Sequence, residues 1–274
     1  MKVYLSVDME GITGLPDYTY VSSNEKNYER GRLIMTREAN AVIEAAFEAG
    51  ATEVVVNDSH SKMNNIIIEE LHQEAQLITG DVKPFSMVQG LTADFDAAIF
   101  VGYHARAGQK GVMSHAMTWG VRNMWIDDHV IGELGFNAMV AGHYGVPVVM
   151  VAGDDCAAEE AHKLIENVKT VAVKETISRS SVKSLTPAKA REKLKLATGE
   201  ALSGRKSIQP VTASDAPVLK IEFTNYGEAE WAALMPGTVL EPGTCIVSYK
   251  AKNILEAYQA MLVMTELAMR TTFC

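Results

Sequence analysis

Residues 4–16 read YLSVDMEGITGLP, an apolar run that ends on two acids, Asp8 and Glu10, and continues into glycines. The apolar run over residues 2–7 predicts a buried strand. Side chains at positions i and i+2 of an extended chain point the same way, so both acids can face one site. Crowded carboxylates are costly unless a cation or a proton neutralises them. The stretch therefore predicts a core strand with a polar site at its end.

Strand and helix patterns alternate through the first part of the chain. Apolar runs at residues 53–57, 97–101 and 146–152 predict further buried strands, and helical patterns cover residues 24–49 and 134–144. Strands that are apolar on both faces and alternate with helices are typical of α/β proteins. We therefore predict a mainly parallel sheet covered by helices.

The part of the chain after residue 165 has a different pattern of hydrophobic and polar residues. Two helices and two half-buried strands are predicted in it, at residues 187–202 and 253–270 and at residues 218–224 and 244–249. We expect an α/β metal-binding catalytic domain over residues 1–165. Residues 166–274 are expected to form a smaller α+β region with a C-terminal helix, packed on the first domain.

Composition excludes several classes of protein. The chain has 274 residues, 47% of them hydrophobic, and a net charge of −9, so we expect a substantial core and no nucleic-acid partner. It contains no apolar stretch near the roughly 20 residues needed to cross a bilayer, and its start is too short in apolar residues for a secretory signal. Three cysteines without a CxxC pattern indicate neither a disulfide framework nor a thiolate zinc site. We expect a cytoplasmic protein without a membrane partner.

Polar residues follow three of the predicted strands. Asp58 and His60 come after the second strand and His104 after the next, in addition to the two acids after the first. Ligands of open α/β sheets bind beyond the carboxyl ends of the strands, and carboxylates with imidazoles suit a divalent metal such as zinc. A single acid or histidine at such a place is more often a turn former or a surface residue. From the residues alone, two interpretations remain open: a metal site, or ordinary turn and surface residues.

Two further polar residues have ordinary explanations when taken alone. His115 lies in a stretch rich in glycine, where a polar loop residue is unremarkable, and Glu133 opens a predicted helix. An acid at a helix N-terminus is favoured by the helix dipole. Neither residue by itself indicates a function.

Several blocks of the sequence resemble the zinc-dependent D-aminopeptidases of the dipeptide-transport operon type. The blocks are VDMEGITG, NDSHSKMNN, GDVKPFSM, GYHARAG, GVMSHAM, IGELGFNA, VAGDD and the closing AYQAMLVMTELAMRTTFC, and the resemblance spans essentially the whole chain. It implies a hydrolase of D-amino-acid peptides with two zinc ions per chain. It also implies self-association into a homo-oligomeric ring, a decamer of two stacked pentamers.

The resemblance assigns roles residue by residue. It places the zinc ligands at Asp8, Glu10, His60, His104 and Glu133. Asp8 is the expected bridging ligand, and His115 matches the catalytic nucleophile or base of the family. Asp58 is not among the ligands, and we interpret it as a residue that orients His60 or forms a turn.

The predicted function is a zinc-dependent aminopeptidase that removes N-terminal D-amino acids from short peptides such as D-Ala-D-Ala. Two metals would activate the water, with His115 as acid/base or nucleophile. One alternative is another two-metal hydrolase, an amidase or a phosphoesterase, whose basic neighbours could be Lys62, Arg106, Lys110 and Arg122. The other is a non-catalytic peptide-binding protein, for which a missing ligand would be expected, and none is missing.

Overall fold

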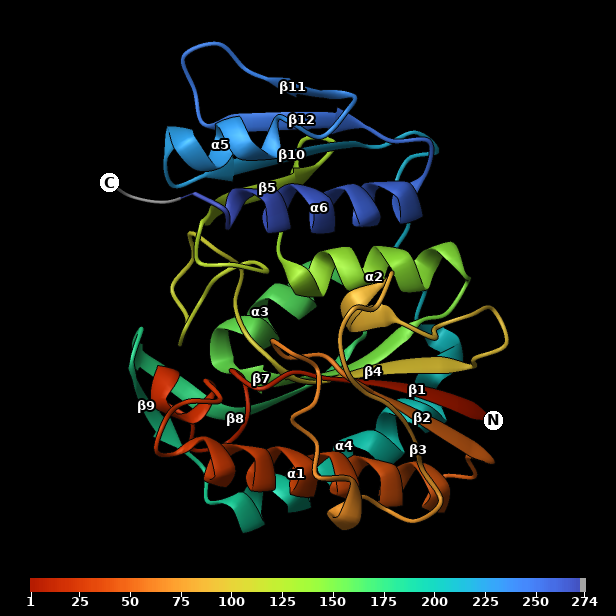
Figure 1. The fold of residues 1–274 in the computed structure, drawn as a ribbon. Helices are drawn as coiled ribbons and strands as arrows, with labels where there is room; N and C mark the ends of the chain where they lie inside the picture. Colours follow the sequence, from red (N-terminus) through yellow and green to blue (C-terminus); the bar gives the residue numbers. More distant parts are fainter. Residues whose placement is uncertain (272–274) are drawn as a thin grey trace.

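The computed structural model describes residues 1–271 and contains two sheets separated by helices (Figure 1). The larger sheet has seven strands in the order β3-β2-β1-β4-β7-β8-β9, all parallel except for the antiparallel pair β8–β9. Its strands are β1 (Lys2–Val7), β2 (Glu53–Asp58), β3 (Gln76–Ile78), β4 (Ala97–Tyr103), β7 (Val148–Asp154), β8 (Lys169–Ser178) and β9 (Ser181–Ser184). The predicted mainly parallel sheet is confirmed.

Helices cover both faces of this sheet, as its apolar strands require. On one face lie α1 (Tyr28–Glu48) and α4 (Pro187–Gly204), which pack against each other, and on the other lie α2 (Glu133–His143) and α3 (Asp155–Leu164) (Figure 1). Every residue of β4 and β7 is buried. The two central strands therefore form the middle of the core.

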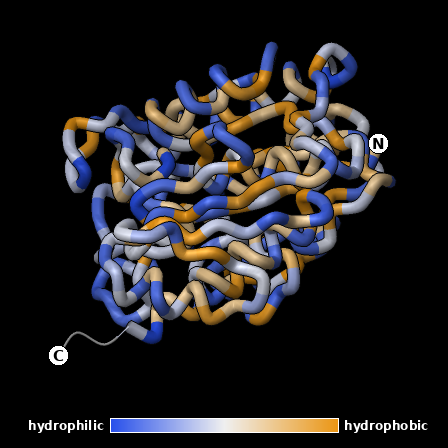
Figure 2. The backbone as a smooth tube through the Cα atoms, turned by 90° about the horizontal axis from the view of Figure 1, so that it is seen from above, coloured by the Kyte–Doolittle hydropathy of each residue, from blue (hydrophilic) through white to orange (hydrophobic). Residues whose placement is uncertain are grey.

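The second sheet is antiparallel, with its five strands in the order β11-β12-β10-β5-β6. The strands are β5 (Val121–Ile126), β6 (His129–Ile131), β10 (Val218–Phe223), β11 (Thr238–Leu240) and β12 (Ile246–Lys250), accompanied by α5 (Tyr226–Ala232) and α6 (Ile254–Ala268). Buried and half-buried residues alternate along β10, and Figure 2 shows hydrophobic and hydrophilic residues alternating along the strands in this view. Such alternation fits a sheet with only one face on a core. Helix α6 fills the layer between this sheet and α2 (Figure 1).

The predicted elements all occur, with differences at their ends. The helix expected over residues 24–49 begins only at Tyr28, because residues 18–27 form a short 3-10 helix and turns. Further 3-10 helices span Ile68–Glu70, Ser86–Val88 and Arg205–Ser207. The described part of the chain has no helix that is long and apolar enough to cross a membrane. Cys156 and Cys245 are free, and Cys274 lies outside the described residues.

The domain boundary at residue 165 stays a prediction. Each of the two sheets contains strands from both sides of this boundary. Strands β8 and β9, which follow residue 165, extend the larger sheet, and β5 and β6, which precede it, belong to the smaller one. The chain thus leaves the larger sheet after β4 and returns to it at β7. The segment between these strands carries His115 and the start of α2.

The topology brings the predicted ligands to one place. Strand β1 lies between β2 and β4, and its last residue, Val7, is in register with Asp58 on one side and Val101 on the other. The strand order reverses here, which in open α/β sheets opens a crevice at the carboxyl ends. Gly102, at φ +75°, lets the end of β4 lie close to the backbone that follows β1. A Cβ at residue 102 would overlap the carbonyl oxygen of Asp8.

Candidate metal centre

The loops after β1 and β2 bring three predicted ligands together. The Nδ1 atom of His60 lies 2.9 Å from Glu10 Oε2 and 3.4 Å from Asp8 Oδ1. All three side chains are almost completely buried. The two acids thus face one imidazole, although Met9 and Glu10 lie in a bend and a turn after β1 and not in the extended chain that the prediction assumed.

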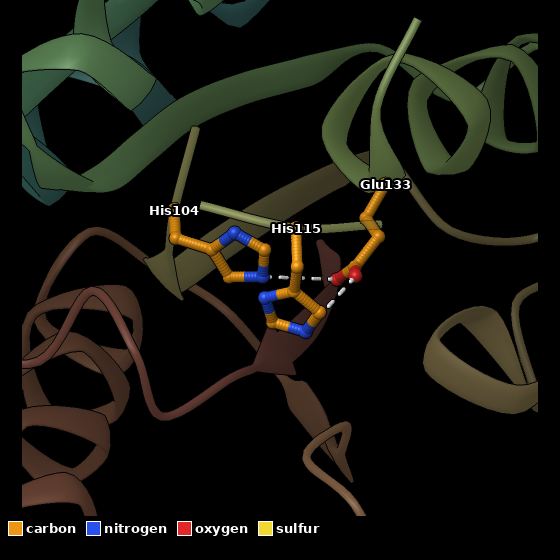
Figure 3. A group of neighbouring side chains, drawn as sticks. All are labelled: His104, His115 and Glu133. Carbon is orange, nitrogen blue, oxygen red and sulfur yellow. Dashed lines mark ion pairs between the residues drawn. The ribbon is translucent and has the colours of Figure 1, made fainter. Parts of the chain in front are cut away.

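The remaining two predicted ligands lie beside the other carboxylate oxygen of Asp8. The Nε2 atom of His104, which directly follows β4, is 3.5 Å from Asp8 Oδ2 and 3.3 Å from Glu133 Oε2. Glu133 is the first residue of α2, and its Oε1 accepts a hydrogen bond of 2.5 Å from the backbone N–H of Met117. Figure 3 shows the carboxylate of Glu133 directed at the rings of His104 and His115. Asp8 therefore lies between two groups of predicted ligands, with Oδ1 toward His60 and Oδ2 toward His104.

Hydrogen bonds on the far side of each ring leave the other ring nitrogen facing the carboxylates. The Nδ1 atom of His104 lies 3.0 Å from the carbonyl oxygen of Ala105, and the Nε2 atom of His60 lies 2.7 Å from that of Val21. A carbonyl oxygen only accepts, so these nitrogens carry the proton. In a neutral ring, the other nitrogen is then an acceptor. An imidazole whose other ring N–H donates to a backbone carbonyl is typical of metal-binding histidines.

Three buried atoms in the cluster make no hydrogen bond of acceptable geometry, although each has an ion-pair neighbour at 2.9 to 3.5 Å: Asp8 Oδ2, Glu10 Oε2 and His104 Nε2. Buried polar atoms without partners are rare in folded proteins because each costs the desolvation free energy of that group. All three are acceptors, or become acceptors when the ring is neutral, so a cation satisfies them together. Nitrogen and carboxylate donors are also the set that zinc accepts. The residues fit a divalent metal centre.

The pKa values in the metal-free protein reflect the same crowding. Burial and the charge of Glu10 raise the pKa of Asp8 from 3.8 to about 7. Burial disfavours the charged imidazoles, but the neighbouring carboxylates outweigh it and hold the pKa of His60 and of His104 well above the ordinary value. Protons therefore supply positive charge to the cluster when no metal does.

His115 lies beside this cluster and differs from the other two histidines. Its Nδ1 is 2.8 Å from the carbonyl oxygen of Met113, so the proton sits there and Nε2 presents a lone pair 3.7 Å from Glu133 Oε1. The ring stacks on His104 with centroids 4.2 Å apart, and the half-exposed Trp119 covers it at 4.4 Å. Burial and the neighbouring His104 lower the pKa of His115. His115 is thus a neutral ring with a basic nitrogen directed at the cluster.

Asp58 does not touch the ring of His60. Its Oδ2 accepts from the backbone N–H groups of Asn65 and Ile66, at 2.5 and 2.7 Å, and its Oδ1 from the side-chain amide of Asn65. Of the two interpretations open for Asp58, these contacts favour the turn former, which orders the loop that carries His60.

The contacts of the basic side chains lend no support to a phosphate site. Three of them bind elsewhere: Lys62 pairs with Asp81, Arg122 with Glu222, and Arg106 donates to the carbonyl of Ala107. Lys110 is exposed. Within residues 1–271, then, these contacts bring no cluster of cations to the metal centre.

An α/β fold with clustered carboxylates and imidazoles at its switch point, and a basic histidine beside them, defines a metal-dependent hydrolase. The sequence matches the D-aminopeptidase family of peptidases over residues 1–263. It is 65% identical over 274 residues to a D-aminopeptidase of Bacillus subtilis (strain 168), covering 100% of both chains. The chain belongs to the D-aminopeptidase family and is an enzyme, which confirms the resemblance.

A solved structure agrees over the full length. The Zn-dependent D-aminopeptidase DppA from Bacillus subtilis, a self-compartmentalizing protease, matches with a TM-score of 0.99 and 64% identity, covering 100% of both chains. The predicted fold class is confirmed by this similarity.

Proposed function

We propose that this protein is a zinc-dependent aminopeptidase that removes N-terminal D-amino acids from short peptides such as D-Ala-D-Ala. The observation that carries the proposal is the set of orphaned acceptor atoms on Asp8, Glu10 and His104, which a pair of cations would satisfy. Membership of the D-aminopeptidase family and the zinc dependence of the Bacillus subtilis relative support it. Two zinc ions per chain would be held by Asp8, Glu10, His60, His104 and Glu133.

The zinc ions, when bound, supply Lewis acidity toward the peptide carbonyl and acidify water. The side chains of the protein would hold the zinc ions and surround the substrate. Asp8, between the two groups of proposed ligands, would join them, while Glu10 contacts His60 and Glu133 contacts His104 and His115. Burial excludes bulk water, which strengthens electrostatic interactions with the substrate carbonyl.

His115 acts as the general base in this proposal, and then as the acid that protonates the leaving amine. The hydrogen bond from Nδ1 to Met113 fixes the tautomer, so Nε2 is free to take a proton at the cluster. Its lowered pKa keeps the ring neutral near pH 7, as a base requires. The sandwich between His104 and Trp119 restricts the ring to this orientation.

Self-association into a homo-oligomeric ring, a decamer, is part of the same proposal. The Bacillus subtilis relative is described as a self-compartmentalizing protease. Large apolar side chains are exposed on the second sheet, its helices and the turn after α5, at Trp231, Leu234, Val239 and Val263. Exposed apolar groups of this kind suit contacts between subunits. Light scattering on the purified protein tests the assembly, and the mass of a single chain would contradict it.

The activity is tested on purified protein with D-Ala-D-Ala and L-Ala-L-Ala, before and after chelation, beside the zinc content per chain. We expect about two zinc ions per chain and chelator-sensitive release of D-alanine only. Bound metal without release from either peptide would instead point to an amidase or a phosphoesterase.

A further inference from the structure

Two buried lysines lie beside the loops that carry the metal ligands. Lys174 on β8 is 1% exposed and Lys83, between β3 and β4, is 7% exposed. A lysine is almost never this buried unless its ammonium group is paired or hydrogen-bonded, because removing the charge from water is costly. The partners of each lysine therefore indicate what the charge is used for.

Lys174 binds the loop that follows β1. Its Nζ donates to the carbonyl oxygens of Glu10, Ile12 and Leu15, at 2.5, 2.8 and 2.7 Å. An ammonium group has three N–H donors, and the three carbonyls use all of them. The side chain reaches across from β8 to fix a stretch of backbone that begins at a predicted ligand.

Two further contacts hold the same loop from other sides. The buried carboxylate of Glu38 on α1 accepts from the N–H of Thr13 at 3.2 Å, and the N–H of Gly11 donates to the carbonyl of Gly102 at 2.7 Å. The loop is thus tied to three different elements. Because the backbone of the loop is held, only side-chain rotation can change the position of the Glu10 carboxylate.

Lys83 makes the equivalent contacts at the end of β2. Its Nζ donates to Asn57 Oδ1 at 2.8 Å, to the carbonyl of Asp58 at 2.7 Å and to the carbonyl of Ile78 at 3.3 Å. Asp58 is two residues before His60 and organises the loop that carries it. Lys83 therefore joins the ends of β2 and β3 at the base of the second ligand loop.

We propose that Lys174 and Lys83 are positioning residues of the metal centre, which hold the loops after β1 and β2 in the arrangement that binds metal before any metal arrives. The inference rests on the zinc centre of the proposed function. Removing groups that orient metal ligands typically weakens metal affinity about 10- to 100-fold, because the ligands must then be ordered by the metal itself.

The test uses Lys174→Met and Lys83→Met, which keep much of the side-chain length and remove the donors. Thr198→Val is the control, since Thr198 on α4 is fully buried and its hydroxyl contacts only the carbonyl of Leu194 and the sulfur of Met150, which belong to neither ligand loop. Zinc affinity is measured by competition with a chelator, and amide hydrogen exchange is measured on the metal-free proteins.

We expect both lysine variants to bind zinc roughly 10- to 100-fold more weakly than wild type, and the control to bind it normally. Without metal, amides of residues 11–15 should exchange about tenfold faster in Lys174→Met only, and amides of residues 60–66 in Lys83→Met only. If Lys174→Met is not recovered folded, Lys174→Gln, which retains two N–H donors, gives the same readouts with smaller changes.

Folded lysine variants that bind zinc as wild type does would overturn the inference. So would loosening of both loops together in every variant, control included, because that pattern reflects general stability. A wild type that binds no zinc would refute the proposed function, and the loop-specific exchange would still decide whether the lysines hold the loops.

Discussion

Replacing Asp8 by Asn is expected to stabilise the metal-free protein while it removes metal binding. In the metal-free fold, Asp8 is buried beside Glu10, and its pKa is raised from 3.8 to about 7. Asn keeps the acceptor for the N–H of Met9 and removes the charge that burial and the neighbouring Glu10 disfavour. The substitution thus replaces a repelled charge with a neutral amide.

The size of the effect follows from linkage. Each unit of pKa shift corresponds to about 1.4 kcal/mol, so an ionised Asp8 at pH 7 costs the fold roughly 4 kcal/mol. Because Asp8 and Glu10 share their charge and the Asn amide must itself be desolvated, we expect about half of this gain. A gain of about 2 kcal/mol raises the Tm of a chain of this size by roughly 4–6 °C.

Thermal unfolding of chelator-treated wild type and Asp8→Asn, at pH 7 and at pH 5, measures the difference. An acid whose pKa is raised in the fold destabilises it above the unfolded pKa of 3.8, and the penalty grows as the pH rises toward the folded value of about 7. The advantage of the variant should therefore be smaller at pH 5 than at pH 7. A metal-free variant no more stable than wild type at pH 7, or a variant that still binds zinc at full affinity, would refute the reasoning.

Three further outcomes are expected. His115→Ala should keep its zinc and lose about 10²- to 10⁴-fold in kcat on D-Ala-D-Ala, and loss of zinc would make this residue a ligand instead. Trp119→Ala should lower kcat with unchanged zinc content, since it frees the ring of His115, and an unchanged kcat would contradict that role. Because carboxylates raise the pKa values of His60 and His104, zinc binding should release protons and strengthen from pH 6 to pH 8, as calorimetry in buffers of different ionisation enthalpy can measure.

The sequence predicted strands β1, β2, β4 and β7 of the larger sheet because their signals are local. Runs such as residues 97–101 and 146–152 are apolar throughout and correspond to β4 and β7, which are buried on both faces. The short strands β3, β6 and β11 were missed, since three residues carry no periodic pattern. Strands β5, β8 and β9 and helices α3 and α5 were not predicted either.

The assignment of strands to sheets could not be predicted. Strand β5 pairs with β10, so Val121–Ile126 joins a partner that lies about a hundred residues further along the chain. Such pairing depends on which apolar faces are left uncovered once the larger sheet has formed, and no local pattern reports this. The predicted domain boundary near residue 165 rested on the kinds of strand and helix patterns before and after it. In the structure, each sheet contains strands from both sides of this residue.

The sequence by itself determined that polar residues follow the apolar strands, and its resemblance to a family named the ligands. Only the tertiary structure decided which atoms face one another. The carbonyls of Val21, Ala105 and Met113 select the free nitrogen of each histidine. The same holds for Lys174, whose acceptors lie about 160 residues away in the chain. Hydrogen bonds between distant segments form only when packing brings them together, so these features belong to the fold.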